Sequence, residues 1–371
     1  MAESARLVDL VQAGIDEFLD GRAPLLESIA SELAPFVDYS RELLRGGKRF
    51  RALFCYWGWN AVSDQDAAGD PDDIRYRELP SVIRAATALE IFHAAALVHD
   101  DIMDNSDTRR GLPSAHKRFE AIHRDGSWTG SAEVFGRSGA LLLGDLLLDW
   151  SDELFQRGLR ELSNVGAADA ARREFDRMRT EVTVGQYLDI LEEQSWQTYP
   201  DAELLPRAHR VIVYKSAKYS VEAPLSIGAT LGGGSLGQIA ALREFGLPLG
   251  VAYQLRDDLL GVFGDSEVTG KPSGDDLREG KRTVLIAIAR AKLPLNARRL
   301  LDELLGDSAL SGQQVSMLQA SIRDSGAVEQ VERIIDHNVK QAIAALSSAP
   351  ISTTAREQLV RLTDTVIRRT A

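Results

Sequence analysis

Apolar residues recur every three or four positions along almost the whole of this 371-residue chain. That spacing places them on one face of an α-helix, which completes a turn every ~3.6 residues. The chain has no convincing run of alternating apolar and polar residues bounded by hairpin turns, the pattern typical of strands. The sequence therefore predicts an all-α protein.

The same pattern predicts where the helices lie. They are expected at Arg6 to Leu19, Ala23 to Leu44, Arg49 to Val62, Leu79 to Met103, Pro113 to His123, Ala132 to Leu162, Ala167 to Glu193, Asp201 to Val213, Tyr214 to Leu231, Leu236 to Phe263 and Thr283 to Ala291, followed by further amphipathic segments. Longer breaks are expected at Ser63 to Glu78, Arg124 to Ser131 and Gly264 to Arg282. Because no flexible linker or fixed-period repeat is evident, we expect one domain over residues 1–371.

Charge and cysteine content exclude several classes of function. Lys and Arg number 43 against 55 Asp and Glu, a net charge of −12 without a basic block, so nucleic acid is not an expected partner. The single cysteine, Cys55, excludes an internal disulfide and favours the cytoplasm. Met1 to Asp20 lacks the features of a signal peptide, and the apolar stretch Ala140 to Leu148 is too short to span a bilayer. We therefore expect no transmembrane segment.

A cluster of carboxylates follows the apolar run Leu89 to Val98. Asp100 and Asp104 are four residues apart, which places them on one helix face with Asp101 beside them. Carboxylates so close repel one another unless a cation lies between them, and Mg²⁺ binds through one or two carboxylates plus phosphates and water. The cluster predicts a magnesium site, and the alternative is a solvated acidic helix end.

Basic residues surround this cluster in the sequence. His93 lies on nearly the same helix stripe as Asp100, and Arg109 and Arg110 follow shortly after. Acids for a metal and arginines for phosphate oxygens together predict a diphosphate site. On its own, His93 is more typical of a core histidine.

A second acidic pair, Asp257 and Asp258, ends another apolar helical run, Leu247 to Leu255. We expect the two pairs to face each other across a cavity and to share divalent ions. The loop that follows, Gly264 to Lys271, differs from a nucleotide P-loop because five residues separate its glycines and Pro272 replaces the Ser or Thr. It is either a lid that brings Lys271 to a phosphate or a plain exposed loop.

Near the N-terminus, the segment GGKRFR (residues 46–51) combines a glycine turn with three cations at a helix start. This arrangement suits an anion, although it also occurs in solvated basic patches. Together with DDIMD (100–104), RRG (109–111), QLRDDLLGVFGD (254–265) and TGK (269–271), it resembles the trans-polyprenyl (short-chain isoprenyl) diphosphate synthase family, and geranylgeranyl diphosphate synthases in particular. The resemblance covers roughly Gly46 to Arg282.

The resemblance implies a fold and an activity. The fold is a single large helical bundle of the isoprenoid synthase type around a central cavity. The activity is magnesium-dependent condensation of isopentenyl diphosphate with dimethylallyl, geranyl or farnesyl diphosphate. The products are diphosphate and a trans-prenyl diphosphate, with geranylgeranyl diphosphate the expected one. It further implies a homodimer and three Mg²⁺ ions per active site.

It also implies roles for individual residues. Isopentenyl diphosphate would be bound by Lys48, Arg51, His93 and Arg110. Magnesium on the allylic diphosphate would be held by Asp100, Asp104 and Asp257, and the same diphosphate would be gripped by Arg109, Lys215 and Lys271. The allylic cation would be flanked by Gln186, Ser216 and Gln254, and Lys281 is a further candidate for the closing lid.

Two residues differ from the usual pattern of this family, and one feature bears on the length of the product. Gly261 stands where many members have a third aspartate, and Ser216 stands where threonine is usual. Ala95 and Ala96, just before Asp100, are small, which predicts a product longer than farnesyl diphosphate. Phe92 is the candidate floor of the product cavity or, alternatively, a packing residue.

Other functions compete with this interpretation. A class I terpene cyclase also carries DDxxD, but it is expected to lack GGKRFR and to have a different second metal motif. A catalytically silent regulatory subunit often loses one aspartate motif, whereas both pairs persist in this chain. An acidic helical protein without a ligand is the remaining alternative.

Overall fold

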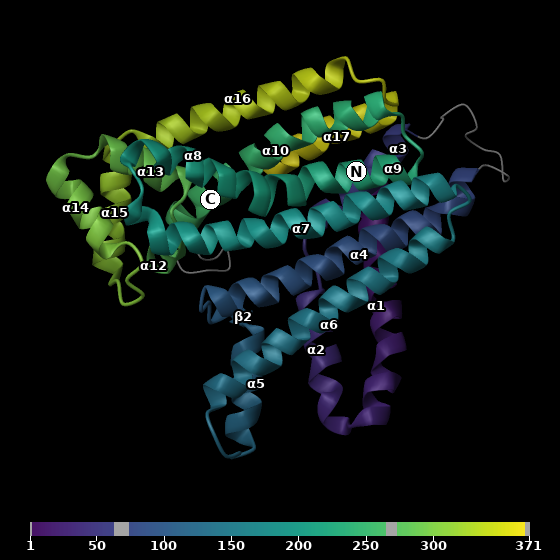
Figure 1. The fold of residues 1–371 in the computed structure, drawn as a ribbon, viewed down its shortest axis with the longest axis horizontal. Coiled ribbons are helices and arrows are strands. Elements are labelled where there is room, and N and C mark those ends of the chain that lie inside the picture. Colours follow the sequence, from purple (N-terminus) through teal and green to yellow (C-terminus); the bar gives the residue numbers. More distant parts are fainter. Residues whose placement is uncertain (1, 63–73, 265–272, 368–371) are drawn as a thin grey trace. The chain divides into compact units, whose positions relative to one another are not determined.

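The structure of the protein, a computed structural model, describes residues 2–62, 74–264 and 273–367 (Figure 1). These residues are helical except for turns, short connections and one small hairpin, so the predicted all-α class is confirmed. The chain forms two compact units, one of residues 1–172 and 227–234 and the other of residues 173–226 and 235–371. The single domain expected over residues 1–371 stays a prediction.

The first unit is built around the long helix α4. Its elements are α1 (Ala2–Ile29), the 3₁₀ turn η1 (Ser31–Leu33), α2 (Ala34–Leu43), α3 (Phe50–Val62), α4 (Ile74–Met103), β1 (Thr108–Arg109), β2 (Leu112–Pro113), α5 (Ala115–Asp125) and α6 (Ala132–Arg160). Helices α4 and α6 run side by side, and α1 and α3 also pack on α4 (Figure 1). Since α4 is covered on several sides, its sequence is apolar around most of its circumference.

This burial also explains why α4 has the length and hydropathy of a membrane span. Its residues 77–103 have a mean hydropathy of 1.4 over the most apolar window, and 72% of that window is buried inside the protein. Leu89 and Ala95, for example, are fully buried. Packing within the protein therefore accounts for the apolar length of this helix.

The second unit is built around α10. Its elements are most of α7 (Val165–Ser195), η2 (Trp196–Thr198), α8 (Asp201–Val211), the π-helix η3 (Ile212–Glu222), the start of α9 (Ala223–Leu231), α10 (Leu236–Phe263), α12 (Asp275–Glu279), α13 (Val284–Lys292), α14 (Leu295–Leu304), α15 (Gly312–Asp324), α16 (Ala327–Ser347) and α17 (Thr353–Ile367). A continuous core joins apolar residues of α10, α13, α15 and α16. A capping box between Ser235 and Gln238 begins α10 by satisfying backbone donors of its first turn.

Some predicted helix boundaries were wrong. Helix α1 continues through the break expected after Leu19, and the chain breaks instead at Ala30, whose backbone is extended. Pro35 explains where the next helix begins, because proline lacks the amide hydrogen that a first helical turn leaves unbonded. Of the loop expected at 63–78, residues 63–73 lie outside the described part, and α4 already begins at Ile74.

Residues 201–231 form one continuous helical stretch, not two helices separated after Val213. Its middle part, η3, is a π-helix, whose wider turns are frequent at functional sites. The break expected at 124–131 is confirmed, since α5 ends at Asp125 and α6 begins at Ala132.

Candidate active site

The first aspartate site lies where α4 ends. The Asp104 amide donates a hydrogen bond to the Asp100 carbonyl oxygen at 2.8 Å, so the helical turn continues one residue past Met103. This places Asp100 and Asp104 on one face, as predicted, and both are partly buried. Asp101 is only 1% exposed and accepts hydrogen bonds from Arg109, one of them from Nε at 3.0 Å. Arg109 therefore fixes the Asp101 carboxylate, while Asp100 and Asp104 lie at the end of the helix.

A hairpin turn brings the two arginines back to this helix end. Thr108 pairs with Pro113 and Arg109 with Leu112, which leaves a two-residue turn of Arg110 and Gly111, both with positive φ. Such turns match the twist of the paired strands and favour glycine at their second position. Arg109 Nη2 lies 3.6 Å from Asp100 Oδ2, so a cation is already in place beside the carboxylate pair.

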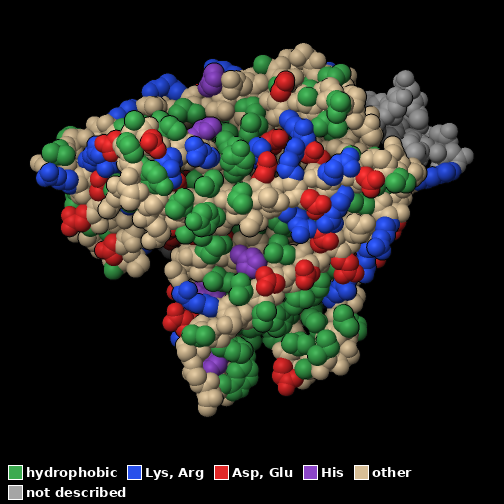
Figure 2. All heavy atoms as spheres, in the orientation of Figure 1, with side chains coloured by type: hydrophobic (Ala, Val, Ile, Leu, Met, Phe, Trp, Pro, Cys, Tyr) green, Lys and Arg blue, Asp and Glu red, His purple; other side chains and the backbone are tan. Residues whose placement is uncertain are grey.

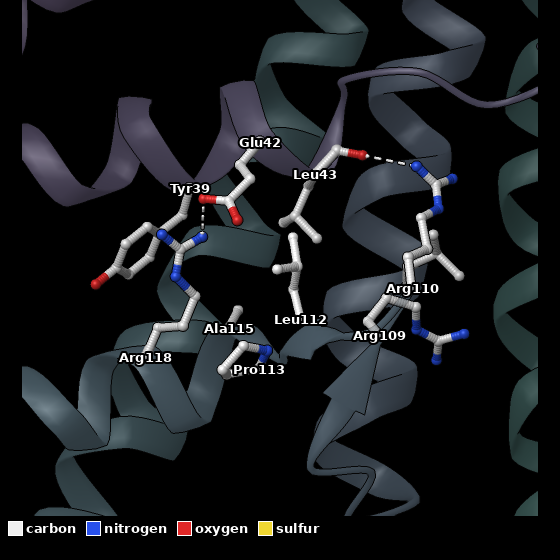
Figure 3. A pocket seen from close by; sticks show the side chains of 10 residues that line it. Tyr39, Glu42, Leu43, Arg109, Arg110, Leu112, Pro113, Ala115 and Arg118 are labelled. Carbon is white, nitrogen blue, oxygen red and sulfur yellow. Dashed lines mark hydrogen bonds and ion pairs between the residues drawn. The ribbon is translucent and has the colours of Figure 1, made fainter. Parts of the chain in front are cut away.

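The Arg110 side chain extends toward the segment that precedes α3. Its Nη1 donates to the Leu43 carbonyl oxygen at 3.3 Å (Figure 3). It also donates to the Arg45 carbonyl oxygen at 3.5 Å. A Cβ atom on Gly47 would lie 3.6 Å from Arg110 Nη2, and Gly47 has a φ of 88° that strongly favours glycine. The glycine turn of GGKRFR and the arginine hairpin therefore meet.

His93 lies among these cations. Its pKa is held well below the usual value by burial and by the positive charges of Arg51, Arg110, Arg109 and Arg49. The unit thus brings together three of the four residues expected to bind isopentenyl diphosphate, and Lys48 is exposed on the segment beside them. A neutral imidazole among guanidinium groups suits an anionic ligand.

Arg49 is one of the three cations of GGKRFR, but sequence reasoning gave it no role of its own. It is buried, has a φ of 50°, and donates to Gln12 Oε1 at 2.7 Å and to Glu90 Oε2 at 3.4 Å. Glu90 Oε1 also accepts from the Ala52 amide at 3.2 Å. Arg49 therefore links the start of α3 to α4. In the sequence, the available signal for this contact was Glu90, the one acidic residue inside the apolar run of α4.

A hollow that is partly open to solvent lies next to the hairpin. In Figure 3 the side chains of Leu43 and Leu112, which line it, point toward each other, and Arg118 lies on the opposite side of them from Arg110. The Arg118 guanidinium is 3.8 Å from the Tyr39 ring centroid and 2.6 Å from Glu42 Oε2. Sequence reasoning did not predict this pocket, because its lining comes from α2, α4, α5 and the hairpin.

The second aspartate site lies near the end of α10, where successive residues face different ways. The two Nη atoms of Arg256 donate to the two carboxylate oxygens of Glu332 of α16, at 2.6 and 2.7 Å, which forms a two-pronged ion pair (a fork). Asp258 is buried and accepts a hydrogen bond from Gln254 Nε2 at 2.8 Å, and burial raises its pKa to about 7. Asp257, between these two anchored residues, is exposed.

Lys215 and Lys281 converge on one buried carboxylate of α7. Asp189 Oδ2 lies 2.5 Å from Lys215 Nζ and 3.4 Å from Lys281 Nζ, and Lys281 also pairs with Glu193 at 3.1 Å. Gln186 lies one turn before Asp189 on the same helix, and Ser216 follows Lys215 on the π-helix. Sequence reasoning missed Asp189, although its spacing from Gln186 was the available signal.

Glycines allow the π-helix to approach its neighbours in the second unit. A Cβ atom on Gly185 of α7 would lie 2.5 Å from the Lys215 amide nitrogen, and one on Gly250 of α10 would lie 2.6 Å from Ala217 Cα. Both distances are too short for any side chain. Lys215 therefore reaches Asp189 because its backbone rests directly on α7.

The remaining predicted residues are distributed as follows. Phe92 and Ala95 are buried and Ala96 is partly buried. Lys271 lies outside the described residues. The expected facing of the two aspartate pairs concerns two separate units and stays a prediction.

The donor groups of both aspartate sites suit magnesium. Within residues 2–62, 74–264 and 273–367, no three His, Cys, Asp or Glu side chains are arranged to hold a metal ion by themselves. Magnesium ordinarily takes one or two carboxylates and completes its six oxygens with phosphates and water. Asp100 with Asp104, and exposed Asp257, offer that number of hard oxygen donors, so the residues fit this ion.

Comparison with known proteins gives one consistent family. A family model described as polyprenyl synthetase matches residues 34–322. The crystal structure of geranylgeranyl pyrophosphate synthase from Corynebacterium glutamicum, complexed with isoprenyl diphosphate and magnesium, is 37% identical, covers 98% of this chain and 99% of its own, and superposes with a TM-score of 0.90. Geranylfarnesyl diphosphate synthase of Aeropyrum pernix is 30% identical over 87% of this chain and 91% of its own length. Geranylgeranyl diphosphate synthase of Mycobacterium tuberculosis is 30% identical over 93% and 89%, respectively.

Proposed function

This chain belongs to the polyprenyl synthetase family, and on that premise we propose how its residues carry out the family's reaction. The chain is a prenyltransferase that condenses isopentenyl diphosphate with an allylic diphosphate to give a trans-prenyl diphosphate. Like prenyl synthases in general, it depends on Mg²⁺. The number of ions, the residue roles and the product length below are our proposals.

Isopentenyl diphosphate is assigned to the cations around His93. Arg51 and Arg110 lie close enough to lower its pKa, and Lys48 is on the adjoining segment. Guanidinium and ammonium groups donate charge-assisted hydrogen bonds to phosphate oxygens. Neutral His93 adds a hydrogen-bond donor or acceptor without adding to the positive charge.

The allylic diphosphate is assigned to the aspartate sites and their neighbouring cations. Asp100 and Asp104 would hold magnesium beside Arg109, and Asp257 would hold a further ion, three in all. The bound ions would stabilise negative charge on the departing diphosphate. Lys215, oriented by Asp189, and Lys271 would donate to the same diphosphate. Gln186, Ser216 and Gln254 would present polar groups near the allylic cation.

The protein must also keep water from the allylic cation. Once the carbon–oxygen bond breaks, the double bond of isopentenyl diphosphate attacks the cation, and a proton leaves to the departing diphosphate. Holding each substrate by its own anion site accounts for much of the rate, because the reacting carbons are brought together before the reaction.

Geranylgeranyl diphosphate is the proposed product. Ala95 and Ala96 are small, so a growing chain would meet little bulk beside the part of α4 that precedes Asp100. Phe92 lies eight residues before Asp100, about 12 Å along the helix axis at the usual rise. Phe92 is buried, which supports either a cavity floor or core packing. If Phe92 is the floor, the Phe92→Leu enzyme will make longer chains than the wild type from the same primer.

The observation that carries the function is the placement of an arginine hairpin and a carboxylate pair at one end of α4. The test is elongation of dimethylallyl, geranyl and farnesyl diphosphates with radiolabelled isopentenyl diphosphate and Mg²⁺, followed by dephosphorylation and product sizing. We expect labelled geranylgeraniol from the wild type and none from Asp100→Asn. Absence of labelled product with every primer would contradict the proposal and favour a catalytically silent subunit or a cyclase.

We also propose that the enzyme is a cytoplasmic homodimer. The family resemblance implies the dimer, and exposed apolar residues of α6, including Val134, Leu141 and Leu142, offer a surface for it. The buried single thiol of Cys55 agrees with a reducing compartment.

A further inference from the structure

The two aspartate sites differ at one position. In the first, Asp100 is followed four residues later by Asp104, so two carboxylates share a helix face one turn apart. In the second, Asp257 is followed at the same spacing by Gly261, which has no side chain. By sequence, the second site therefore has one carboxylate fewer on the face that Asp257 occupies.

A carboxylate from another element occupies that position. A Cβ atom built on Gly261 would lie 2.6 Å from Asp276 Oδ1 and closer still to Asp276 Cγ and Oδ2. Asp276 belongs to α12, which packs on α10 in the same unit. A side chain at 261 would meet this carboxylate unless one of the two moved, so the space left by glycine at 261 is the space that Asp276 occupies.

This contact places Asp276 on the same helix face as Asp257. Residues four apart on a helix have Cβ atoms about 5–6 Å from each other, so the carboxylate over Gly261 lies about one turn from Asp257. The rotation of α10 is fixed on both sides of Asp257, by the fork of Arg256 with Glu332 and by the hydrogen bond between Gln254 and Asp258. Asp258 Oδ2 is buried and has no hydrogen-bond partner among the described residues.

The backbone of α12 also fixes Asp276. Gly274 and Gly280, on either side of this short helix, both adopt positive φ. The Asp276 carbonyl oxygen accepts hydrogen bonds from the amides of Gly280 at 3.1 Å and Lys281 at 3.0 Å. The turn that positions Asp276 thus also positions Lys281, which reaches Asp189.

We propose that Asp276 supplies the second carboxylate of the second aspartate site, in the role that Asp104 has in the first. Asp257 and Asp276 then provide two carboxylates, within the one or two that a diphosphate-bound magnesium ion ordinarily takes from protein. Asp276 acts either as a direct ligand or through a bound water. This inference rests on the proposed function, since it concerns the metal ions of that reaction.

The test is Mg²⁺ binding in the presence of inorganic pyrophosphate, read as the rise in unfolding temperature with increasing Mg²⁺. Asp276→Asn keeps the size of the side chain over Gly261, and its unfolding temperature without metal checks that the fold is intact. We expect it to need about ten- to hundredfold more Mg²⁺ than the wild type for half of the stabilisation. The matched control is Asp275→Asn, one residue earlier on α12, for which we expect the wild-type requirement.

A reciprocal pair of variants makes the test sharper. In the single variant Gly261→Asp, the new side chain should overlap Asp276 and lower the stability of the protein. The double variant Gly261→Asp with Asp276→Gly returns a carboxylate to the face of Asp257. It should therefore restore Mg²⁺ binding to within a fewfold of the wild type. The inference is overturned if Asp276→Asn binds Mg²⁺ as the wild type does, if Asp275→Asn is affected equally, or if the double variant fails to recover. Because pyrophosphate replaces the substrates, these outcomes do not depend on whether the wild type elongates a primer.

Discussion

The charge of His93 shows how single residues of this protein are controlled by distant parts of the sequence. Its lowered pKa comes first from burial and then from Arg51 and Arg110, which reach it from the start of α3 and from the hairpin. The helical spacing placed His93 on the stripe of Asp100, but it did not show which cations surround it. Burial and those neighbouring cations together lower the pKa of the imidazole and keep it neutral.

His93 makes the stability of the protein depend on pH. Below about pH 6.5 the unfolded chain binds a proton at this residue while the folded protein does not, so stability falls as pH decreases from 6.5 towards the lowered pKa. The loss cannot exceed about 1.4 kcal/mol per pH unit. We expect His93→Gln to lose less stability than the wild type between pH 7.5 and 5.5 in urea unfolding. Equal losses would show that His93 titrates normally.

Two arginines close to the pocket are expected to differ in their effect on the reaction. Arg110 lies in the cation group of His93, whereas Arg118 is engaged by Glu42 and the Tyr39 ring. Arg110→Gln should raise the KM for isopentenyl diphosphate about ten- to hundredfold, because a hydrogen bond to a charged group contributes about 1.5–3 kcal/mol. Arg118→Gln should leave that KM unchanged. Steady-state kinetics with each substrate varied in turn will measure both, and equal effects of the two changes would contradict the assignment.

At the scale of elements, backbone contact determines where Lys215 lies. The π-helix η3 rests on Gly185 of α7 and on Gly250 of α10. Neither glycine has a positive φ, so each is required by the closeness of the neighbouring backbone and not by its own conformation. The sequence placed a helix boundary after Val213, because a widened turn has no distinct apolar pattern.

Gly185→Ala separates helix propensity from packing. Alanine stabilises an exposed helix by about 1 kcal/mol relative to glycine, but here the added Cβ meets the Lys215 amide and Tyr214 carbonyl carbon. We expect a net loss of about 1–3 kcal/mol in unfolding free energy and a lower kcat, since Lys215 must shift. The matched control is Gly21→Ala in α1, where nothing lies within 4 Å, and which should be neutral or stabilising. A neutral Gly185→Ala would contradict the proposed backbone contact.

At the scale of the whole molecule, the surface combines a net negative charge with local apolar areas. Figure 2 shows acidic and basic side chains mixed over the visible face, with hydrophobic side chains gathered over α5 and α6. On α6, Val134 and Leu141 are seven residues apart, as are Phe135 and Leu142, so they form one stripe. These residues are 37–63% exposed.

This stripe gives a test of the proposed homodimer. Replacing Leu141 and Leu142 by glutamate places charge on the apolar face, so we expect the variant to sediment as a monomer and the wild type as a dimer. Leu236→Glu is the control, because Leu236 is 89% exposed at the start of α10 and lies outside this stripe. If the double variant remains a dimer in sedimentation velocity, the interface lies elsewhere.

The sequence predicted the class of the fold and the location of most helices. It did so because burial imposes a 3.6-residue period on every packed helix, and this period is visible in the chain itself. It was less successful at the ends of helices. The continuation of α1 to Ile29 and the start of α4 at Ile74 depend on what these helices pack against, which the period does not record.

The sequence by itself also determined the chemistry: paired carboxylates at helix ends, cations at a glycine turn and an arginine pair indicate a magnesium-assisted diphosphate reaction. Only the tertiary structure decided which side chains support those residues. Asp189 holds Lys215 across 26 residues, Glu332 holds Arg256 across 76, and Asp276 fills the position left open by Gly261. Such pairs join residues that are far apart in the chain, and a sequence specifies them only through the packing of the helices that carry them.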